Sequence, residues 1–113
     1  MKRSVLPILV TWLMAMPALA ATPATVERPS RLGMCAACHG THGIAKVPGV
    51  PNLAGQKQDY LLHALEQYRD GKRDAAVMRA AVGPLSRKQL ERLAQWFAAQ
   101  PACAPAGKDK ADP

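Results

Sequence analysis

The sequence lacks the residue patterns of an enzyme active site and of a β-sheet. Its 113 residues contain no paired carboxylates, no nucleophile beside a general base and no glycine-rich phosphate loop. No stretch alternates between apolar and polar residues, and no segment repeats. The length allows one small domain. We therefore expect a single helical domain that is not an enzyme.

Acidic residues are scarce. The chain has eight Asp and Glu against fifteen Lys and Arg, which gives a net charge of +7. Such a surface favours acidic proteins, anionic membranes or nucleic acid as partners. Nucleic acid is disfavoured because the basic residues are spread over several segments and because residues 1–20 have the pattern of an export signal, described next. We expect a protein partner with an acidic docking surface or an anionic membrane surface, and the alternative is a basic face that only aids solubility.

Residues 1–20 have the pattern of a cleaved secretory signal peptide. Lys2 and Arg3 precede an apolar run from Val5 to Met16, and Ala18-Leu19-Ala20 fits the cleavage pattern. The run is short, with one proline inside it and another just after it. We therefore expect cleavage, a periplasmic location and no stable membrane insertion, with an uncleaved anchor as the alternative. No other stretch could cross a bilayer, and the mature chain would carry a net charge of +5.

The most specific motif is Cys35-Ala36-Ala37-Cys38-His39. Two cysteines three residues apart, followed directly by histidine, form the attachment pattern of a c-type haem. On a helix, both sulfurs and the imidazole would share one face, so that one porphyrin could bond to the sulfurs while its iron binds His39. A thiol redox pair would need a βαβ context, and a zinc site would need a second ligand pair. The motif therefore predicts one covalently bound haem c.

A haem would also complete the interior. A domain of this size has a marginal apolar core, and a bound macrocycle would supply much of the missing apolar volume. We expect little stable fold without it.

The chain around the motif predicts a short helix followed by a long loop. Pro29 suits the first position of a helix that would run to Ala37 and carry both cysteines. From Gly40 to Gly55 the chain is rich in Gly and Pro, which favours an irregular loop around one edge of the haem.

Three further helices are expected. Apolar residues recur at helical spacing from Gln58 to Arg69, and Asp74 would cap a helix that ends at Val82. Ser86 and Gln89 form a capping box that opens the last helix, whose buried stripe would end before Pro101.

Methionine is the common second axial ligand of electron-transfer cytochromes c. Of the five methionines, three leave with the signal peptide, and Met34 adjoins Cys35 on the side of the first ligand. Met78 is therefore the predicted distal ligand, although a methionine at helical spacing often only fills a core. His42 and His63 are the competing candidates, and ligation by two histidines remains an alternative.

These features together resemble a class I c-type cytochrome, most closely the small bacterial c553 proteins and a single domain of the c4 type. The resemblance covers Cys35 to Pro101. Besides the haem motif with Gly40, it rests on Pro51-Asn52-Leu53-Ala54-Gly55-Gln56, Tyr60-Leu61, Tyr68, Gly71-Lys72-Arg73, Met78 and Leu85-Ser86.

The resemblance implies an all-α class I cytochrome c fold, with about four short helices and loops wrapped around one haem. Residues 21–101 would form this domain, and residues 102–113 a flexible tail. His39 and Met78 would be the axial ligands, with the imidazole N–H of His39 bonded to the carbonyl of Pro51. Such a bond orients the ring and tunes the iron.

The resemblance also implies weaker assignments. Gln56 and Arg73 would lie near the haem propionates. Trp96 or Phe97 would pack against the first helix.

We expect a soluble periplasmic one-electron carrier between respiratory or other redox partners. A haem-based binder or sensor of small ligands with a labile Met78 is one alternative, and an electron-entry subunit of a larger oxidoreductase is another. Cys103 is left over after haem attachment, so it would either link two chains through a disulfide or remain a free thiol.

Overall fold

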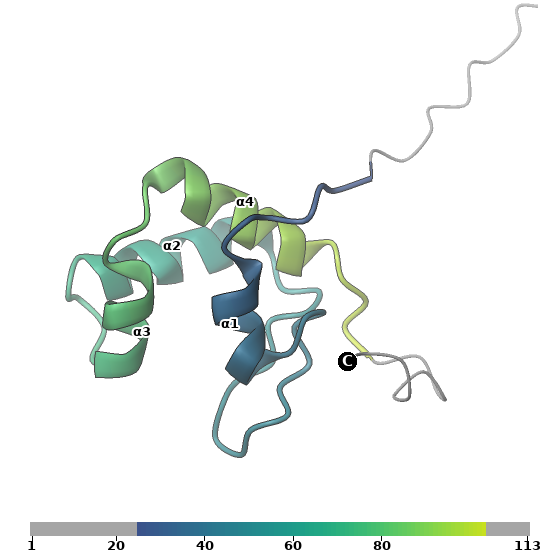
Figure 1. The fold of residues 1–113 in the computed structure, drawn as a ribbon, viewed down its shortest axis with the longest axis horizontal. Helices are drawn as coiled ribbons and strands as arrows, with labels where there is room; N and C mark the ends of the chain where they lie inside the picture. Colours follow the sequence, from purple (N-terminus) through teal and green to yellow (C-terminus); the bar gives the residue numbers. More distant parts are fainter. Residues whose placement is uncertain (1–24, 104–113) are drawn as a thin grey trace, which may run out of the picture.

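Four helices form the regular structure of residues 25–103, the part of the chain that the computed structural model describes (Figure 1). The predicted signal peptide, with its three methionines, and residues 104–113 of the predicted tail lie outside it. No strand occurs between residues 25 and 103, so the prediction of an all-α fold is confirmed. The helices are α1 (Leu32–His39), α2 (Gln58–Arg69), α3 (Ala76–Val82) and α4 (Arg87–Ala98).

The packing of α2 against α4 forms the centre of the fold (Figure 1). α4 begins with the predicted capping box: the Ser86 hydroxyl accepts a hydrogen bond from the Gln89 amide at 3.3 Å, and the Gln89 side chain accepts one from the Ser86 amide at 2.9 Å. The bounds of α2 agree with the prediction, and Gly71 with φ of +75° follows its last turn. None of the described helices is long and apolar enough to span a bilayer.

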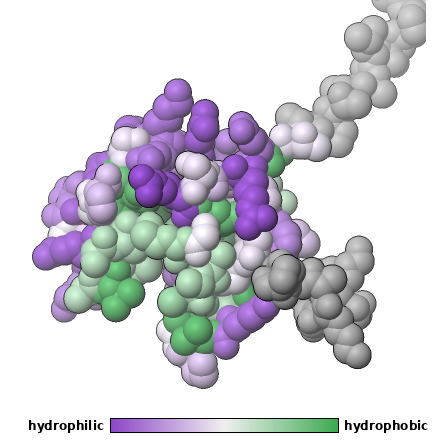
Figure 2. Space-filling model, in the orientation of Figure 1, coloured by the Kyte–Doolittle hydropathy of each residue, from purple (hydrophilic) through white to green (hydrophobic). Residues whose placement is uncertain are grey.

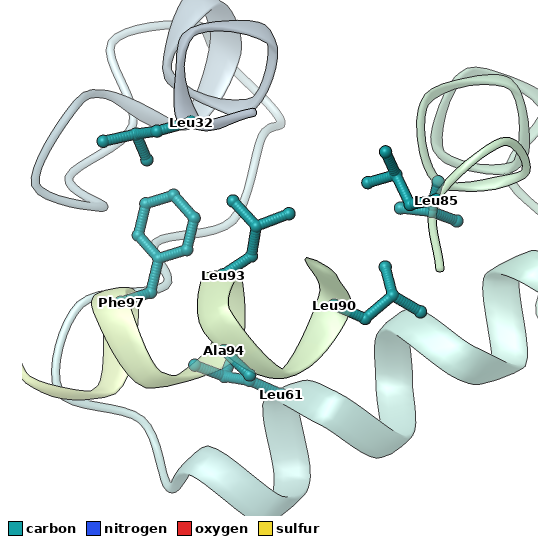
Figure 3. Close-up of a cluster of buried hydrophobic side chains, with 8 residues drawn as sticks. Leu32, Leu61, Leu85, Leu90, Leu93, Ala94 and Phe97 are labelled. Carbon is teal, nitrogen blue, oxygen red and sulfur yellow. The ribbon is translucent and has the colours of Figure 1, made fainter. Parts of the chain in front are cut away.

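The core joins all four helices. Its buried members come from α1, α2, α3, the α3–α4 turn and one stripe of α4, and they are Leu32, Leu61, Val82, Leu85, Leu90, Leu93, Ala94 and Phe97. Figure 3 shows Leu32 of α1 facing Phe97 and Leu93 of α4. Phe97 therefore packs against the first helix, as the resemblance implied. Trp96 is only half-buried and donates a hydrogen bond to the carbonyl of Thr41 at 2.9 Å.

The predicted bounds of the first helix were wrong at both ends. α1 starts three residues after Pro29, because the Pro29 carbonyl closes a turn with the Leu32 amide at 3.1 Å before the helix begins. α1 continues past Ala37 to His39 and ends where Gly40 takes φ of +77°. His39 is therefore the last residue of the helix that carries the cysteines.

The prediction that Asp74 caps α3 was also wrong. The N-cap residue is Ala75, and no side chain bonds to the first turn. The amides of Lys72 and Arg73 both donate to the Gln67 carbonyl, at 2.8 and 3.2 Å. This turn keeps residues 72–75 outside the helix, so Asp74 lies one position too early to cap it.

The loop between α1 and α2 is irregular but firmly held. The carbonyl of Gly43 accepts hydrogen bonds from the amides of Leu53 and Ala54, at 2.7 and 3.1 Å. The amide of Gly55 donates to the carbonyl of Phe97 at 3.0 Å. Together with the Trp96 bond, these contacts fix the loop to the C-terminal end of α4.

Candidate functional site

Helix α1 places the three residues of the attachment motif on one face. Cys35, Cys38 and His39 occupy positions i, i+3 and i+4 of this helix. Cys35 is half-buried against the core, whereas Cys38 is exposed. Burial raises the pKa of the Cys35 thiol, so an unreacted Cys35 would be a neutral thiol at pH 7.

The imidazole of His39 is buried and oriented by the loop. Its Nδ1 atom lies 2.8 Å from the carbonyl oxygen of Pro51, the contact that the resemblance implied. A carbonyl oxygen can only accept, so Nδ1 carries the proton and the lone pair of the neutral ring is on Nε2. His39 is 7% exposed, and this burial together with the bond restricts the ring to one orientation. The arrangement is suited to a metal ligand that binds through Nε2.

Met78 lies on α3, across from α1. Its side chain is half-buried and packs against the same core cluster as Cys35. Figure 1 shows α1 and α3 extending from the same side of the α2–α4 pair. Figure 2 shows a notch between these two parts of the surface, with apolar residues on both sides of it. The fold thus brings a methionine to the side of the molecule that carries the attachment motif.

The competing ligands point elsewhere or are exposed. His42 donates from Nδ1 to the Gln100 side chain at 3.0 Å, and its ring stacks on Trp96 with centroids 6.3 Å apart. These contacts hold His42 at the C-terminal end of α4. His63 on α2 is exposed, and so is Met34, at 46%.

Gln56 and Arg73 both have partners within the chain. The side-chain NH₂ group of Gln56 donates to the carbonyl of Asn52 at 2.6 Å, and the Arg73 guanidinium lies 5.1 Å from the centre of the Tyr68 ring. Both side chains are half-buried. Their contact with haem propionates stays a prediction.

Two contacts that position the site were not predicted from the sequence. The side-chain oxygen of Asn52 accepts a hydrogen bond from the Ala45 amide at 2.7 Å and so braces the residue next to Pro51. The Trp96–Thr41 bond braces the start of the same loop. A Pro-Asn pair in a loop is a signal for a side-chain-to-backbone bond, whereas nothing local indicated the role of Trp96.

The attachment motif and the apolar surface around it fit a haem. Both thiols and the lone pair of His39 come from one helix, and Figure 2 shows apolar residues on both sides of the notch. A macrocycle would cover apolar surface of this kind. Within residues 25–103, no group of three or more His, Cys, Asp or Glu side chains is placed to hold a metal ion.

Comparison with known proteins agrees with this geometry. The cytochrome c family profile matches residues 31–99. Over 71 residues, the chain is 34% identical to cytochrome c4 of Pseudomonas aeruginosa, an alignment that covers 63% of this chain and 35% of that protein. The chain thus spans about a third of the length of this relative. The protein belongs to the cytochrome c family, whose members bind haem c covalently, and Cys35, Cys38 and His39 provide the attachment motif.

Proposed function

We propose that this protein is an exported one-electron carrier with a single haem c, and not an enzyme. Cys35 and Cys38 form the thioether bonds, and His39 and Met78 are the axial ligands. The observation that carries the proposal is the packing of Cys35 and Met78 against one core cluster from two different helices. When bound, the haem supplies the change between ferrous and ferric iron.

The protein's own residues limit structural change during that cycle. The Pro51 carbonyl and the burial of His39 fix the imidazole, and the core contacts of α3 hold Met78. A thioether stabilises ferrous iron and raises the reduction potential. Two protein ligands would also leave no open position for a small molecule, which favours electron transfer over ligand sensing.

Partners and location are part of the proposal. The leader-like residues 1–20 support export to the periplasm, and the excess of basic residues supports docking to acidic surfaces of redox proteins. Half-buried Gln56 and Arg73 are proposed to contact the propionates.

The test is substitution of Met78. Ferric cytochromes with methionine on the iron show a weak far-red charge-transfer band. Met78→Ala should abolish this band, lower the potential and allow carbon monoxide to bind the ferrous form. Met34→Ala removes an exposed methionine next to Cys35 and is the matched control, with the band retained.

Other outcomes would favour the alternatives. A wild-type holoprotein that lacks the band and binds carbon monoxide readily would be a ligand binder or sensor. A holoprotein that copurifies with an oxidoreductase at low salt would be an electron-entry subunit.

Cys103 bears on the oligomeric state. Its thiol is exposed and unpaired within the described chain. A dimer linked through Cys103 is proposed for an oxidising compartment. Non-reducing electrophoresis of the holoprotein tests it, because the dimer band should vanish in Cys103→Ser.

A further inference from the structure

A cavity away from the notch lies between the segment before α1 and the N-terminal half of α4. Its volume is about 320 Å³, at the lower end of the range for small-molecule sites. Arg31, the N-cap residue of α1, forms one side, and Lys88 and Arg92 of α4 form the other. The cavity therefore spans the start of the helix that carries the haem cysteines and the central helix of the core.

The polar side chains around this cavity are suited to donate hydrogen bonds. Besides the three cationic groups, the wall contains Ser30, Ser86 and Gln89. The Ser86 oxygen and the Gln89 carbonyl accept the capping bonds, which leaves the hydroxyl hydrogen and the NH₂ group to donate outward. Among residues 25–103, no carboxylate lines the cavity.

The three cations also lack a counter-charge within residues 25–103. Neither Arg31, Lys88 nor Arg92 forms an ion pair there. The nearest acidic residue in sequence to Lys88 and Arg92 is Glu91, and it is paired with Arg87 at 2.9 Å. All three side chains are exposed, so water weakens their mutual repulsion, but together they give the cavity a positive potential that attracts anions.

A neighbouring cavity does not share these properties. It also contacts Lys88 and Arg92, but its wall includes the Glu91 carboxylate and apolar Leu62. The two cavities therefore share Lys88 and Arg92, and within residues 25–103 the one beside Arg31 differs in having a third cation and no carboxylate in its wall.

We propose that this cavity binds a multivalent oxyanion of the phosphate class and thereby ties the start of α1 to α4. The bidentate guanidinium groups of Arg31 and Arg92 and the ammonium group of Lys88 match the oxygens of such an anion. The ligand is either free phosphate or a phospholipid headgroup. The proposal is independent of the electron-carrier function, because none of these residues belongs to the haem site.

The test is calorimetric titration of the ferric holoprotein with inorganic phosphate, at constant ionic strength against chloride. We expect saturable binding, and a thermal midpoint that rises with phosphate. The double variant Arg31→Ala, Arg92→Ala should weaken binding by about tenfold or more, and Lys88→Gln alone by about fivefold. Lys46→Ala removes an exposed charge in the α1–α2 loop and should leave the affinity unchanged.

A second experiment distinguishes the two sources. Cosedimentation with phosphatidylglycerol vesicles that is competed by phosphate, and lost in the double variant, identifies a headgroup site. Phosphate binding without vesicle binding identifies a site for the free ion. The proposal is overturned by phosphate binding that does not saturate, or by equal weakening in Lys46→Ala, since net charge alone would then explain the binding. The haem absorption and circular dichroism spectra of each variant report that its fold is intact.

Discussion

The imidazole of His39 is held by the backbone of Pro51, twelve residues further along the chain, through a hydrogen bond of 2.8 Å. Side-chain substitution cannot remove this carbonyl, so its effect must be tested through the residues that hold it. Asn52 is the nearest of these, because its side-chain oxygen accepts the Ala45 amide at 2.7 Å and closes the loop on itself.

We predict that Asn52→Ala raises the reduction potential. Loss of the Ala45 contact frees Pro51 to move, which weakens the hydrogen bond from His39. A weaker bond makes the imidazole a poorer donor to iron and so destabilises the ferric state. The expected shift is on the order of 20–40 mV upward, since 59 mV corresponds to a tenfold change for one electron. Potentiometric titration of the holoprotein measures it.

Asn52→Asp is the matched control. It keeps an oxygen that can accept the Ala45 amide, and its added negative charge would favour ferric iron and move the potential downward. An unchanged potential in Asn52→Ala would show that the loop holds Pro51 without the side chain, and a lower one would contradict the predicted weakening of the His39 bond.

We predict that Gly43→Ala strongly destabilises the fold. Gly43 has φ of +77°, and an added Cβ would lie 2.7 Å from the Ala54 nitrogen and 2.9 Å from the Phe97 ring. Strain and steric clash together should lower the free energy of unfolding by about 3 kcal/mol. Guanidinium titration followed by circular dichroism measures the loss.

Gly49→Ala separates the two causes. Gly49 has nearly the same φ, +79°, but nothing lies within 4 Å of the added Cβ. Only the backbone strain remains, so the free energy of unfolding should fall by about 1 kcal/mol. If both substitutions lower the free energy of unfolding equally, Ala54 and Phe97 must shift away from the added Cβ at Gly43 without an energetic penalty.

We predict that Phe97→Ala is among the most damaging core substitutions. The ring is 2% exposed and packs between α4 and Leu32 of α1. Its removal should lower the free energy of unfolding by about 3–5 kcal/mol. Tyr60→Ala, at a residue that is 52% exposed, should change it by less than about 0.5 kcal/mol. A small effect at Phe97 would show that the other contacts of α1, such as Leu32 with Leu93, or the haem hold it without this ring.

The sequence predicted those parts of the fold that local signals determine. α2 and α4 have an apolar stripe at helical spacing, and the Ser86–Gln89 capping box marks the start of α4. α1 has no such stripe, and its start is set by the turn that the Pro29 carbonyl closes with the Leu32 amide, which no pattern in the sequence marked. At α3, Asp74 predicted a side-chain cap. The amides of Lys72 and Arg73 bond instead to the Gln67 carbonyl, so the helix starts later, with Ala75 as its N-cap residue.

In the site, too, the sequence predicted the local arrangement and not the long-range contacts. Cys35, Cys38 and His39 are contiguous on one helix, so their spacing alone predicted their shared face. The contact between His39 and Pro51 was implied only by a family resemblance, because no periodic pattern links a helix end to a loop. The contact between Trp96 and Thr41 joins residues 55 positions apart, and its formation depends on where α4 ends relative to the loop.

The final prediction concerns the bond between Trp96 and Thr41. Trp96→Phe should loosen the α1–α2 loop while the fold stays intact. Phenylalanine keeps an aromatic surface for His42 but cannot donate the 2.9 Å hydrogen bond to Thr41. Stability should fall by about 1 kcal/mol, and amide hydrogens of the loop should exchange faster in NMR spectra of the holoprotein. His42→Ala removes the stacking partner and its hydrogen bond to Gln100 but leaves the indole bond, so its loop should exchange at nearly the wild-type rate. If His42→Ala loosens the loop as much as Trp96→Phe does, the contacts of His42 hold the loop against α4 as much as the indole N–H does.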